Sequence, residues 1–271
     1  MVLHREGITQ NDFIETRKAR RIAPAGFFFA YWGDEQVMQL PVLATPILPQ
    51  IDEGASTASI IEWTLKQFAD QRMVLTTGFG MEGCALIDLY AAHQQPLDVI
   101  YLDTGFFFPE TYHLIDELKA RYPNVTFINS GTKLTPEQQR VRHGDQLWKS
   151  NPDLCCELRK VAPMREALSG VDVWITALRR SQGPSRADLR VVEWNDKYKV
   201  IKVSPLASWS RQDVRKHVTT HKVPYNVLHD QGYPSVGCTH CTQAVAGLSG
   251  EDYSREGRWA GTEKTECGLH T

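Results

Sequence analysis

Six cysteines are the residues of this 271-residue chain best suited to chemistry. Cys155 and Cys156 are adjacent, and Cys238 and Cys241 form a CxxC motif. Four thiolates in two pairs suit a tetrahedral zinc ion or an iron–sulfur cluster. Zinc sites usually separate paired cysteines by two to four residues, so the adjacent pair favours a larger cubane, a [4Fe–4S] cluster. Taken alone, the CxxC motif also fits a redox dithiol.

The other two cysteines have different sequence surroundings. Cys84 begins the apolar segment Cys84-Ala85-Leu86-Ile87, where we expect a buried, inert thiol. Cys267 is the fifth residue from the end of the sequence, near Arg255, Arg258, Lys264 and His270. Cations lower the pKa of a thiol, and the thiolate is the nucleophile. Subtracting four ligands and one core residue leaves Cys267 as the candidate nucleophile; the alternative is a tail cysteine without function.

Basic residues elsewhere in the chain could hold an anion. Lys160 follows Cys156 by four residues and shares a face with it if the segment is helical. Arg179 and Arg180 come directly after the apolar run 171–176, so we expect them to emerge where a strand ends. Arginine binds phosphate or sulfate bidentately. For each single arginine, a solvated surface position is the alternative.

The elements that position these residues alternate along the chain. Short apolar runs predict strands at 73–77, 98–102, 125–128 and 171–176, and helical periodicity predicts helices at 55–68, 85–90 and 109–120. This alternation predicts an α/β fold, Rossmann-like, with a mostly parallel sheet flanked by helices. We divide the chain into an N-terminal extension of unassigned role (1–50), a nucleotide- and cluster-binding domain (51–248) and a mobile C-terminal tail (249–271).

Two polar turns follow predicted strands. Thr77-Gly78-Phe79-Gly80 separates a buried strand from a buried helix, and Asp103 follows the next strand. Ligands of parallel sheets bind beyond the carboxyl ends of the strands, and helix N-termini favour anions. The glycine turn alone is also compatible with a plain tight turn. Together with Asp103 it predicts a nucleotide crevice on one rim of the sheet.

Composition excludes several classes of protein. With 42% hydrophobic and 23% charged residues, the chain is neither disordered nor fibrous, and its formal net charge of −2 argues against binding of duplex nucleic acid. We find no apolar run long enough to span a membrane and no signal peptide. We therefore expect a cytoplasmic protein, in which structural disulfides are rare. The oligomeric state, including a homo-oligomer, stays open.

Four stretches carry a resemblance to a known family: 102–112 (LDTGFFFPETY), 155–160 (CCELRK), 237–242 (GCTHCT) and 266–270 (ECGLH). Over roughly residues 60–271 the chain resembles the assimilatory adenylyl-sulfate and phosphoadenylyl-sulfate reductases. This resemblance implies an adenine-nucleotide α-hydrolase-like sheet with the turn Thr77–Gly80 around the nucleotide. It also implies a [4Fe–4S] cluster on four ligands: Cys155, Cys156, Cys238 and Cys241.

The same resemblance implies the roles of the remaining candidates. Cys267 would be the nucleophile, and the anion would be held by Lys160, Arg179, Arg255, Arg258 and His270. The turn departs from the family's serine-rich pattern at Thr77 and Phe79, so its phosphate contacts are not carried over.

The expected reaction is thioredoxin-dependent reduction of adenylyl sulfate to sulfite and AMP through an S-sulfocysteine. The chain ends at Thr271 without a thioredoxin-like domain, so we expect a separate donor protein, thioredoxin or glutaredoxin. Two alternatives remain. One is the 3′-phosphorylated substrate, which cluster-free members of the family favour. The other is a zinc-binding module without catalysis.

Overall fold

The computed structural model of the protein describes residues 47–247, 255 and 257–270. Residues 1–46 of the expected N-terminal extension, and residues 249–254, 256 and 271 of the expected tail, lie outside the described residues. Its helices are α2 (Thr57–Gln67), α3 (Met81–Ala91), α4 (Pro109–Arg121), α5 (Pro136–His143), α6 (Leu147–Ser150), α7 (Pro152–Cys156), α8 (Ala162–Ala167) and α9 (Arg211–Thr220). Its strands are β1 (Met73–Thr77), β2 (Leu97–Tyr101), β3 (Val125–Asn129), β4 (Val173–Ile175), β5 (Val192–Asn195) and β6 (Val200–Val203).

The six strands form one sheet in the order β3-β2-β1-β4-β6-β5. Every neighbouring pair is parallel except β5 and β6, which form an antiparallel edge. In the central register Leu75 of β1 lies between Val99 of β2 and Ile175 of β4. The predicted α/β fold with a mostly parallel sheet is confirmed, while the β5–β6 hairpin was not predicted.

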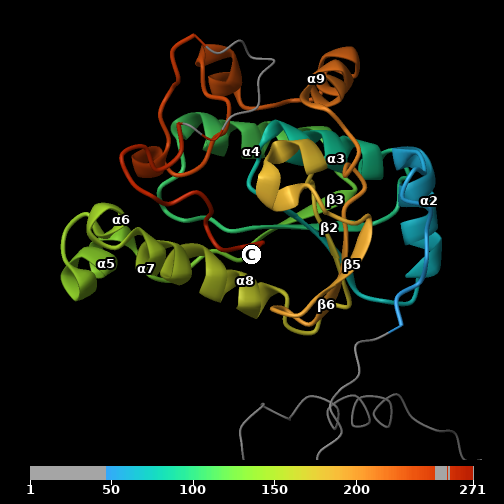
Figure 1. Ribbon diagram of the computed structural model, residues 1–271, viewed down its shortest axis with the longest axis horizontal. Helices are drawn as coiled ribbons and strands as arrows, with labels where there is room; N and C mark the ends of the chain where they lie inside the picture. Colours follow the sequence, from blue (N-terminus) through green and yellow to red (C-terminus); the bar gives the residue numbers. More distant parts are fainter. Residues whose placement is uncertain (1–46, 248–254, 256, 271) are drawn as a thin grey trace, which may run out of the picture. The chain divides into compact units, whose positions relative to one another are not determined.

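Alternating residues of the central strands supply two hydrophobic cores. Leu75 belongs to the larger core, which also includes residues of α2, α3, α4 and α9. Val74 and Trp174 face the opposite way, into a smaller core formed with α8. Figure 1 shows α3, α4 and α9 on one side of the sheet and α7 and α8 on the other. Burial on both faces is typical of parallel sheets that helices cover.

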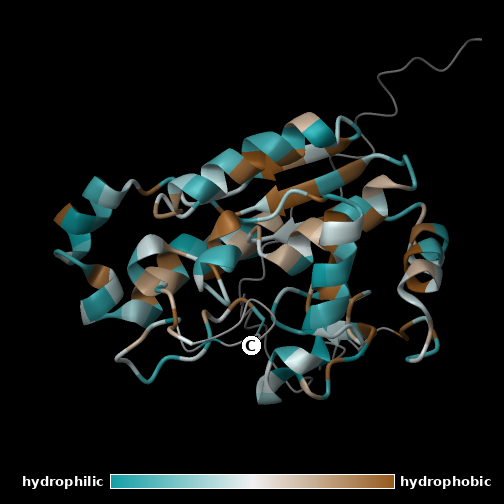
Figure 2. Cartoon of the chain, turned by 90° about the horizontal axis from the view of Figure 1, so that it is seen from above, coloured by the Kyte–Doolittle hydropathy of each residue, from teal (hydrophilic) through white to brown (hydrophobic). Residues whose placement is uncertain are grey.

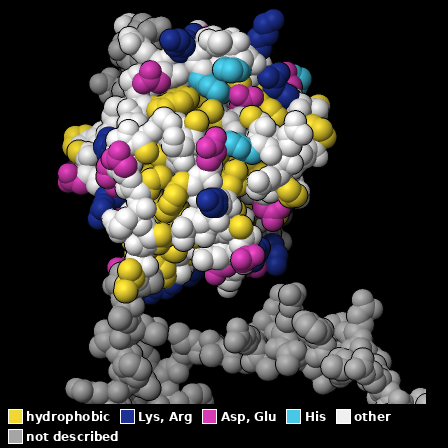
Figure 3. All heavy atoms as spheres, turned by 90° about the vertical axis from the view of Figure 1, so that its right-hand side faces the viewer, with side chains coloured by type: hydrophobic (Ala, Val, Ile, Leu, Met, Phe, Trp, Pro, Cys, Tyr) yellow, Lys and Arg dark blue, Asp and Glu magenta, His cyan; other side chains and the backbone are white. Residues whose placement is uncertain are grey.

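Hydropathy follows this layering. Hydrophobic residues concentrate on the strands and on the inner sides of the helices (Figure 2). On the face shown in Figure 3, acidic and basic side chains are intermixed. Among the described residues, no helix has the length and apolar character needed to cross a membrane.

The strand order places a switch point at the centre of the sheet. From β1 the chain adds β2 and β3 on one side, whereas β4 and β6 continue the sheet on the other. The connections therefore diverge between β1 and β4, and sheets of this kind bind ligands at such a point, beyond the carboxyl ends of the strands. The turn Thr77–Gly80 follows β1, and Thr176 to Arg179 follow β4, so both segments lie at that end of the sheet.

The turn after β1 is held by a hydrogen bond between the Thr77 side chain and the backbone. Thr77 Oγ1 accepts a hydrogen bond from the N–H of Phe79 at 2.9 Å. Phe79 has a left-handed φ of 60°, and its side chain is fully buried, with an edge contact to Tyr101. A Cβ at Gly83 would lie 2.3 Å from Thr77 Oγ1, so glycine is required for α3 to approach β1 this closely. Any contact of Phe79 with a ligand at the rim must therefore come from its backbone.

A buried carboxylate fastens α3 beneath this turn. Glu82 lies 2.7 Å from Arg179 Nη2 and 3.1 Å from Arg211 Nη1 of α9. Burial raises the pKa of Glu82, but the charges of Arg211 and Arg179 outweigh it and lower the pKa to about 2. Because the folded pKa lies below the unfolded value, the pair contributes stability above about pH 4.5 and loses it as the pH falls toward 2.

We expect Glu82→Gln to lower the free energy of unfolding at pH 7 by about 3 kcal/mol, because it removes the charge between two buried guanidinium groups. The acid-induced loss of stability between about pH 4.5 and pH 2 should shrink with it. Thermal melting of the holoprotein across this pH range measures both effects. Glu62→Gln, at an exposed position of α2, is the matched control and should leave the melting curves unchanged. Equal stability of the two variants would contradict the assignment.

Candidate active site

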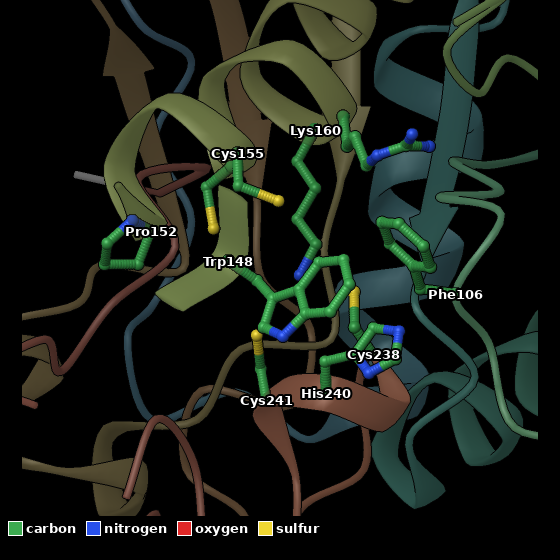
Figure 4. A pocket seen from close by; sticks show the side chains of 10 residues that line it. Phe106, Trp148, Pro152, Cys155, Lys160, Cys238, His240 and Cys241 are labelled. Atoms are coloured by element: carbon green, nitrogen blue, oxygen red, sulfur yellow. The ribbon is translucent and has the colours of Figure 1, made fainter. Parts of the chain in front are cut away.

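The four paired cysteines line one cavity, shown in Figure 4. Cys155 and Cys156 come from α7, and Cys238 and Cys241 come from the turn of the CxxC motif. All four are free thiols, and three of them are buried. The expectation that the two pairs converge, although they are more than 80 positions apart in the sequence, agrees with this geometry.

The adjacent pair lies at the end of α7, directly before a wide helical turn. Helix α7 begins at Pro152 behind Asn151, whose side chain accepts a hydrogen bond from Leu154 N at 3.0 Å. After Cys156 the helix continues as a π-helical turn, Glu157–Val161, before α8 begins. Such turns occur mostly as single insertions within α-helices, and they are frequent at functional sites. In Figure 4 Lys160 extends from this turn toward the space between the cysteines, and it hydrogen-bonds Cys238.

Aromatic rings form one wall of the cavity. The rings of Trp148 and His240 stack with their centroids 3.8 Å apart, and Phe106 packs edge-on against both. The guanidinium of Arg159 lies 4.3 Å from the Phe106 ring centroid, and its Nε donates to Gln139 at 2.6 Å. This wall keeps water away from the thiols and lowers the local dielectric constant.

The thiols differ in their electrostatic surroundings. Burial raises the pKa of three of them, Cys155, Cys156 and Cys241, the last to about 11. Burial also disfavours the Cys238 thiolate, but Lys160, the Thr104 hydroxyl and Arg258 outweigh it, so the pKa of Cys238 is lowered. Thr104 Oγ1 lies 3.4 Å from Cys238 Sγ.

The donor set fits an iron–sulfur cofactor. Such clusters are held by cysteine thiolates, and four free thiols line one cavity together with Lys160. Among the described residues, no three His, Cys, Asp or Glu side chains are grouped as they would be around a single metal ion.

The described part of the tail is folded against this site. Cys267 lies near enough to Lys160, Cys156 and Tyr198 to interact with them electrostatically. Beyond it Leu269 packs on the smaller core, and the His270 ring stacks on Trp174 at 5.0 Å. The predicted mobile tail is therefore docked in this structure, and its mobility stays a prediction.

The strand-end arginines differ from the expectation. The Arg179 side chain does not emerge at the rim, because it is fully buried and paired with Glu82 of α3. The expectation that it emerges there was therefore wrong, and a contact with the anion stays a prediction. Arg186, on the short turn Pro184–Arg186, reaches the tail instead and pairs with Glu266. Position after a strand, which was the signal for Arg179 within the chain itself, does not tell which arginine of the loop turns inward.

The other predicted anion-binding residues lie around the folded tail. Arg255 Nε donates to Thr265 O at 3.1 Å, so its side chain binds the backbone two residues before Cys267. Arg258 Nε donates to Cys241 O, and its charge reaches Lys160 and Cys238. Burial among cations holds the pKa of His270 well below its usual value, so this ring is neutral in the docked tail.

Asp103 follows strand β2, as predicted, and its carboxylate binds neighbouring residues of the protein. Its Oδ1 accepts hydrogen bonds from Gly105 N at 2.8 Å and from Tyr112 OH at 3.0 Å. Glycine is required at position 131, because a Cβ there would lie 2.1 Å from the Asp103 carbonyl oxygen. Asp103 thus shapes the turn after β2, and a contact with substrate stays a prediction.

The parallel sheet, its central switch point and the polar turns on one rim define an α/β protein of the adenine-nucleotide α-hydrolase-like class. A chain of Candida glabrata FMN adenylyltransferase shares this fold, with a TM-score of 0.51 at 15% identity over 78% of this chain and 74% of that one. The family model described as "Phosphoadenosine phosphosulfate reductase domain" matches residues 72–244. The chain belongs to the phosphoadenosine phosphosulfate reductase family.

Individual relatives agree with this assignment. The adenosine 5'-phosphosulfate reductase of Geobacillus kaustophilus (strain HTA426) is 44% identical over 225 residues, 83% of this chain and 94% of that protein. Adenosine 5'-phosphosulfate reductase 1 of Bacillus subtilis (strain 168) is 44% identical over 83% of this chain and 95% of that protein. The crystal structure of phosphoadenylyl-sulfate reductase from Candida auris, a phosphate complex, is similar with a TM-score of 0.62 at 33% identity, covering 71% of this chain and 91% of that one.

Proposed function

We propose that this protein is an adenylyl-sulfate reductase that forms sulfite and AMP in assimilatory sulfate reduction. Relatives with that name are 44% identical over most of the chain. The observation that carries the proposal is the docked tail, which brings Cys267 beside Lys160 at the four-cysteine cavity. A nucleophile, a cation and a nucleotide crevice on one sheet are the parts that this reaction requires.

In the proposed first step the Cys267 thiolate attacks the sulfate sulfur of adenylyl sulfate. An S–S bond forms, the bond from sulfur to the bridging oxygen breaks, and AMP leaves with that oxygen. Lys160, Arg186, Arg255 and Arg258 surround the tail and would stabilise the negative charge on the transferred group. The uncapped N–H groups at the start of α3 would hold the nucleotide phosphate.

In the proposed second step a dithiol donor of the thioredoxin or glutaredoxin type attacks Cys267 Sγ. Sulfite leaves with the electron pair of the S–S bond, and a mixed disulfide forms. The second thiol of the donor then displaces Cys267 as a thiolate, so the donor leaves oxidised by two electrons. The tail must leave its docked position for this step, because Cys267 is only partly exposed there.

We assign a [4Fe–4S] cluster to Cys155, Cys156, Cys238 and Cys241, as the adjacent pair and the shared cavity support. When bound, the cluster supplies a fixed inorganic charge beside Lys160 and links α7 to the CxxC turn. The two electrons of the reaction come from the donor dithiol.

The compartment follows from the chemistry of the cysteines. A reducing compartment such as the cytoplasm keeps the cysteine thiols of the protein reduced, and we place the protein there.

Adenylyl sulfate should be preferred over its 3′-phosphorylated form, because in the family this chain resembles a full set of cluster cysteines accompanies the unphosphorylated substrate. We expect kcat/KM for adenylyl sulfate to be higher by at least about tenfold, or 1.4 kcal/mol. Sulfite formation with both nucleotides in competition measures this ratio. A tenfold preference for the phosphorylated nucleotide would instead identify the protein as a phosphoadenylyl-sulfate reductase. Binding of zinc without any sulfite formation would support the non-catalytic alternative.

A further inference from the structure

The residue that precedes the candidate nucleophile joins two arginines from distant segments. Glu266 Oε1 lies 3.3 Å from Arg186 Nη2, and Glu266 Oε2 lies 3.2 Å from Arg255 Nη2. Arg186 belongs to the connection between β4 and β5, whereas Arg255 lies near the start of the tail. One carboxylate therefore holds both guanidinium groups next to Cys267.

These three side chains are sheltered from solvent. Their exposed fractions are 11% for Arg186, 19% for Glu266 and 22% for Arg255. Water and salt screen charges less in such a place than on an open surface. The three groups together carry a net charge of +1, so the cluster attracts anions even while the carboxylate is in place. Lys202 and His270 border the same cavity as Arg186 and Glu266.

A pair of arginines beside a nucleophile would bind free sulfate or phosphate without discrimination, because a guanidinium recognises any such oxyanion. A carboxylate already placed between the two arginines lowers their affinity for such anions. An incoming anion must first displace Glu266, and its binding then costs the ion pairs that Glu266 makes with Arg186 and Arg255. A nucleotide-linked anion has additional contacts in the crevice to offset that loss, whereas a free inorganic anion has none.

We propose that Glu266 is an internal anion that occupies Arg186 and Arg255 and so excludes free inorganic oxyanions from the site. The proposal rests on the proposed function, because it takes Cys267 as the nucleophile toward a nucleotide-linked sulfate. Glu266 is in this sense a specificity-determining residue. It acts against anions that lack the adenosine group.

The test is the affinity of the holoenzyme for inorganic phosphate, measured by isothermal titration calorimetry at constant ionic strength. We expect Glu266→Gln to bind phosphate about tenfold more tightly than the wild type, because the competing charge is gone. Two controls should retain the wild-type affinity. Glu266→Asp keeps the charge, and Glu263→Gln makes the same chemical change at an exposed position of the same segment.

A second arm separates loss of charge from release of the tail. Lys264 pairs with the exposed carboxylate of Asp153, so Asp153→Asn loosens the tail without changing Glu266. Phosphate affinity in this variant should equal that of the wild type. Tight binding in Asp153→Asn, or unchanged binding in Glu266→Gln, would overturn the proposal. Sulfite formation by the wild type is measured separately, so a failure of the proposed function is distinguishable from a failure of this inference.

Discussion

Sulfite formation should disappear when Cys267 is replaced by serine, with kcat reduced on the order of 10⁴-fold or more. A serine hydroxyl is a much weaker nucleophile at neutral pH, and a sulfate ester on serine could not be released by thiol exchange. Nucleotide binding and iron content should be retained, because Cys267 belongs neither to the turn Thr77–Gly80 nor to the lining of the four-cysteine cavity. Rates of sulfite release, equilibrium binding of AMP and iron analysis measure these three properties.

Cys84→Ala is the matched control for this experiment. The Cys84 side chain is fully buried in α3, and burial together with the charge of Glu82 raises the pKa of its thiol. Its loss should therefore leave the chemistry unchanged. Wild-type protein given adenylyl sulfate without a donor should carry one sulfite equivalent on the peptide that contains Cys267. An adduct on Cys84, or an active Cys267→Ser variant, would mean that the nucleophile is wrongly assigned.

Cys156→Ser should lose both bound iron and most of the soluble yield. Anaerobically purified wild type is expected to contain about four irons and four sulfides per chain, as four cysteine ligands imply. Cys156 is buried at the end of α7, and the cavity it lines is shared by two segments far apart in the sequence. Ligand binding of this kind is coupled to folding, so removal of one thiolate affects both.

Cys84→Ser distinguishes a ligand effect from a general effect of placing a hydroxyl in the interior. Cys84 is more deeply buried than Cys156 but lies outside the cavity. This variant should therefore keep its iron, even if its stability falls. Full iron content in Cys156→Ser would contradict the ligand assignment, and colourless wild-type protein with stoichiometric zinc would contradict the cluster.

The central strands and their helices could be read from the sequence, because their apolar runs are short and are separated by glycine and aspartate. The prediction failed at the β5–β6 hairpin, where charged residues belong to the strands. Lys202 is buried on β6 and pairs with Glu193 of β5 at 2.7 Å. The sequence of these strands therefore lacks the regular alternation of apolar and polar residues, although the strands are well packed. Such cross-strand pairing is a tertiary effect that single-residue propensities do not contain.

Residue types and motif spacing identified the cysteine pairs, but they did not predict which residues surround the cysteines in the fold. The stack of Trp148 on His240 joins residues 92 positions apart, and nothing in either local pattern signals it. The role of Arg186 was missed for the same reason, since its partner Glu266 lies in the tail. Arg179 was misjudged because a strand end predicts position along the chain, whereas burial beneath α3 depends on how the helix packs.

The π-helical turn after Cys156 has a consequence for how this lineage of proteins can change. The turn holds one residue more than a regular helical repeat, and an extra residue of this kind lowers the stability of a helix unless another interaction compensates for it. Here the turn carries Lys160, whose side chain hydrogen-bonds Cys238. Deletion of one residue would restore a regular helix and rotate the residues on its two sides by about 100° relative to each other. The two cysteines and the elements after the turn could then no longer keep their present faces together, so a deletion in this helix is expected to be less well tolerated than a substitution.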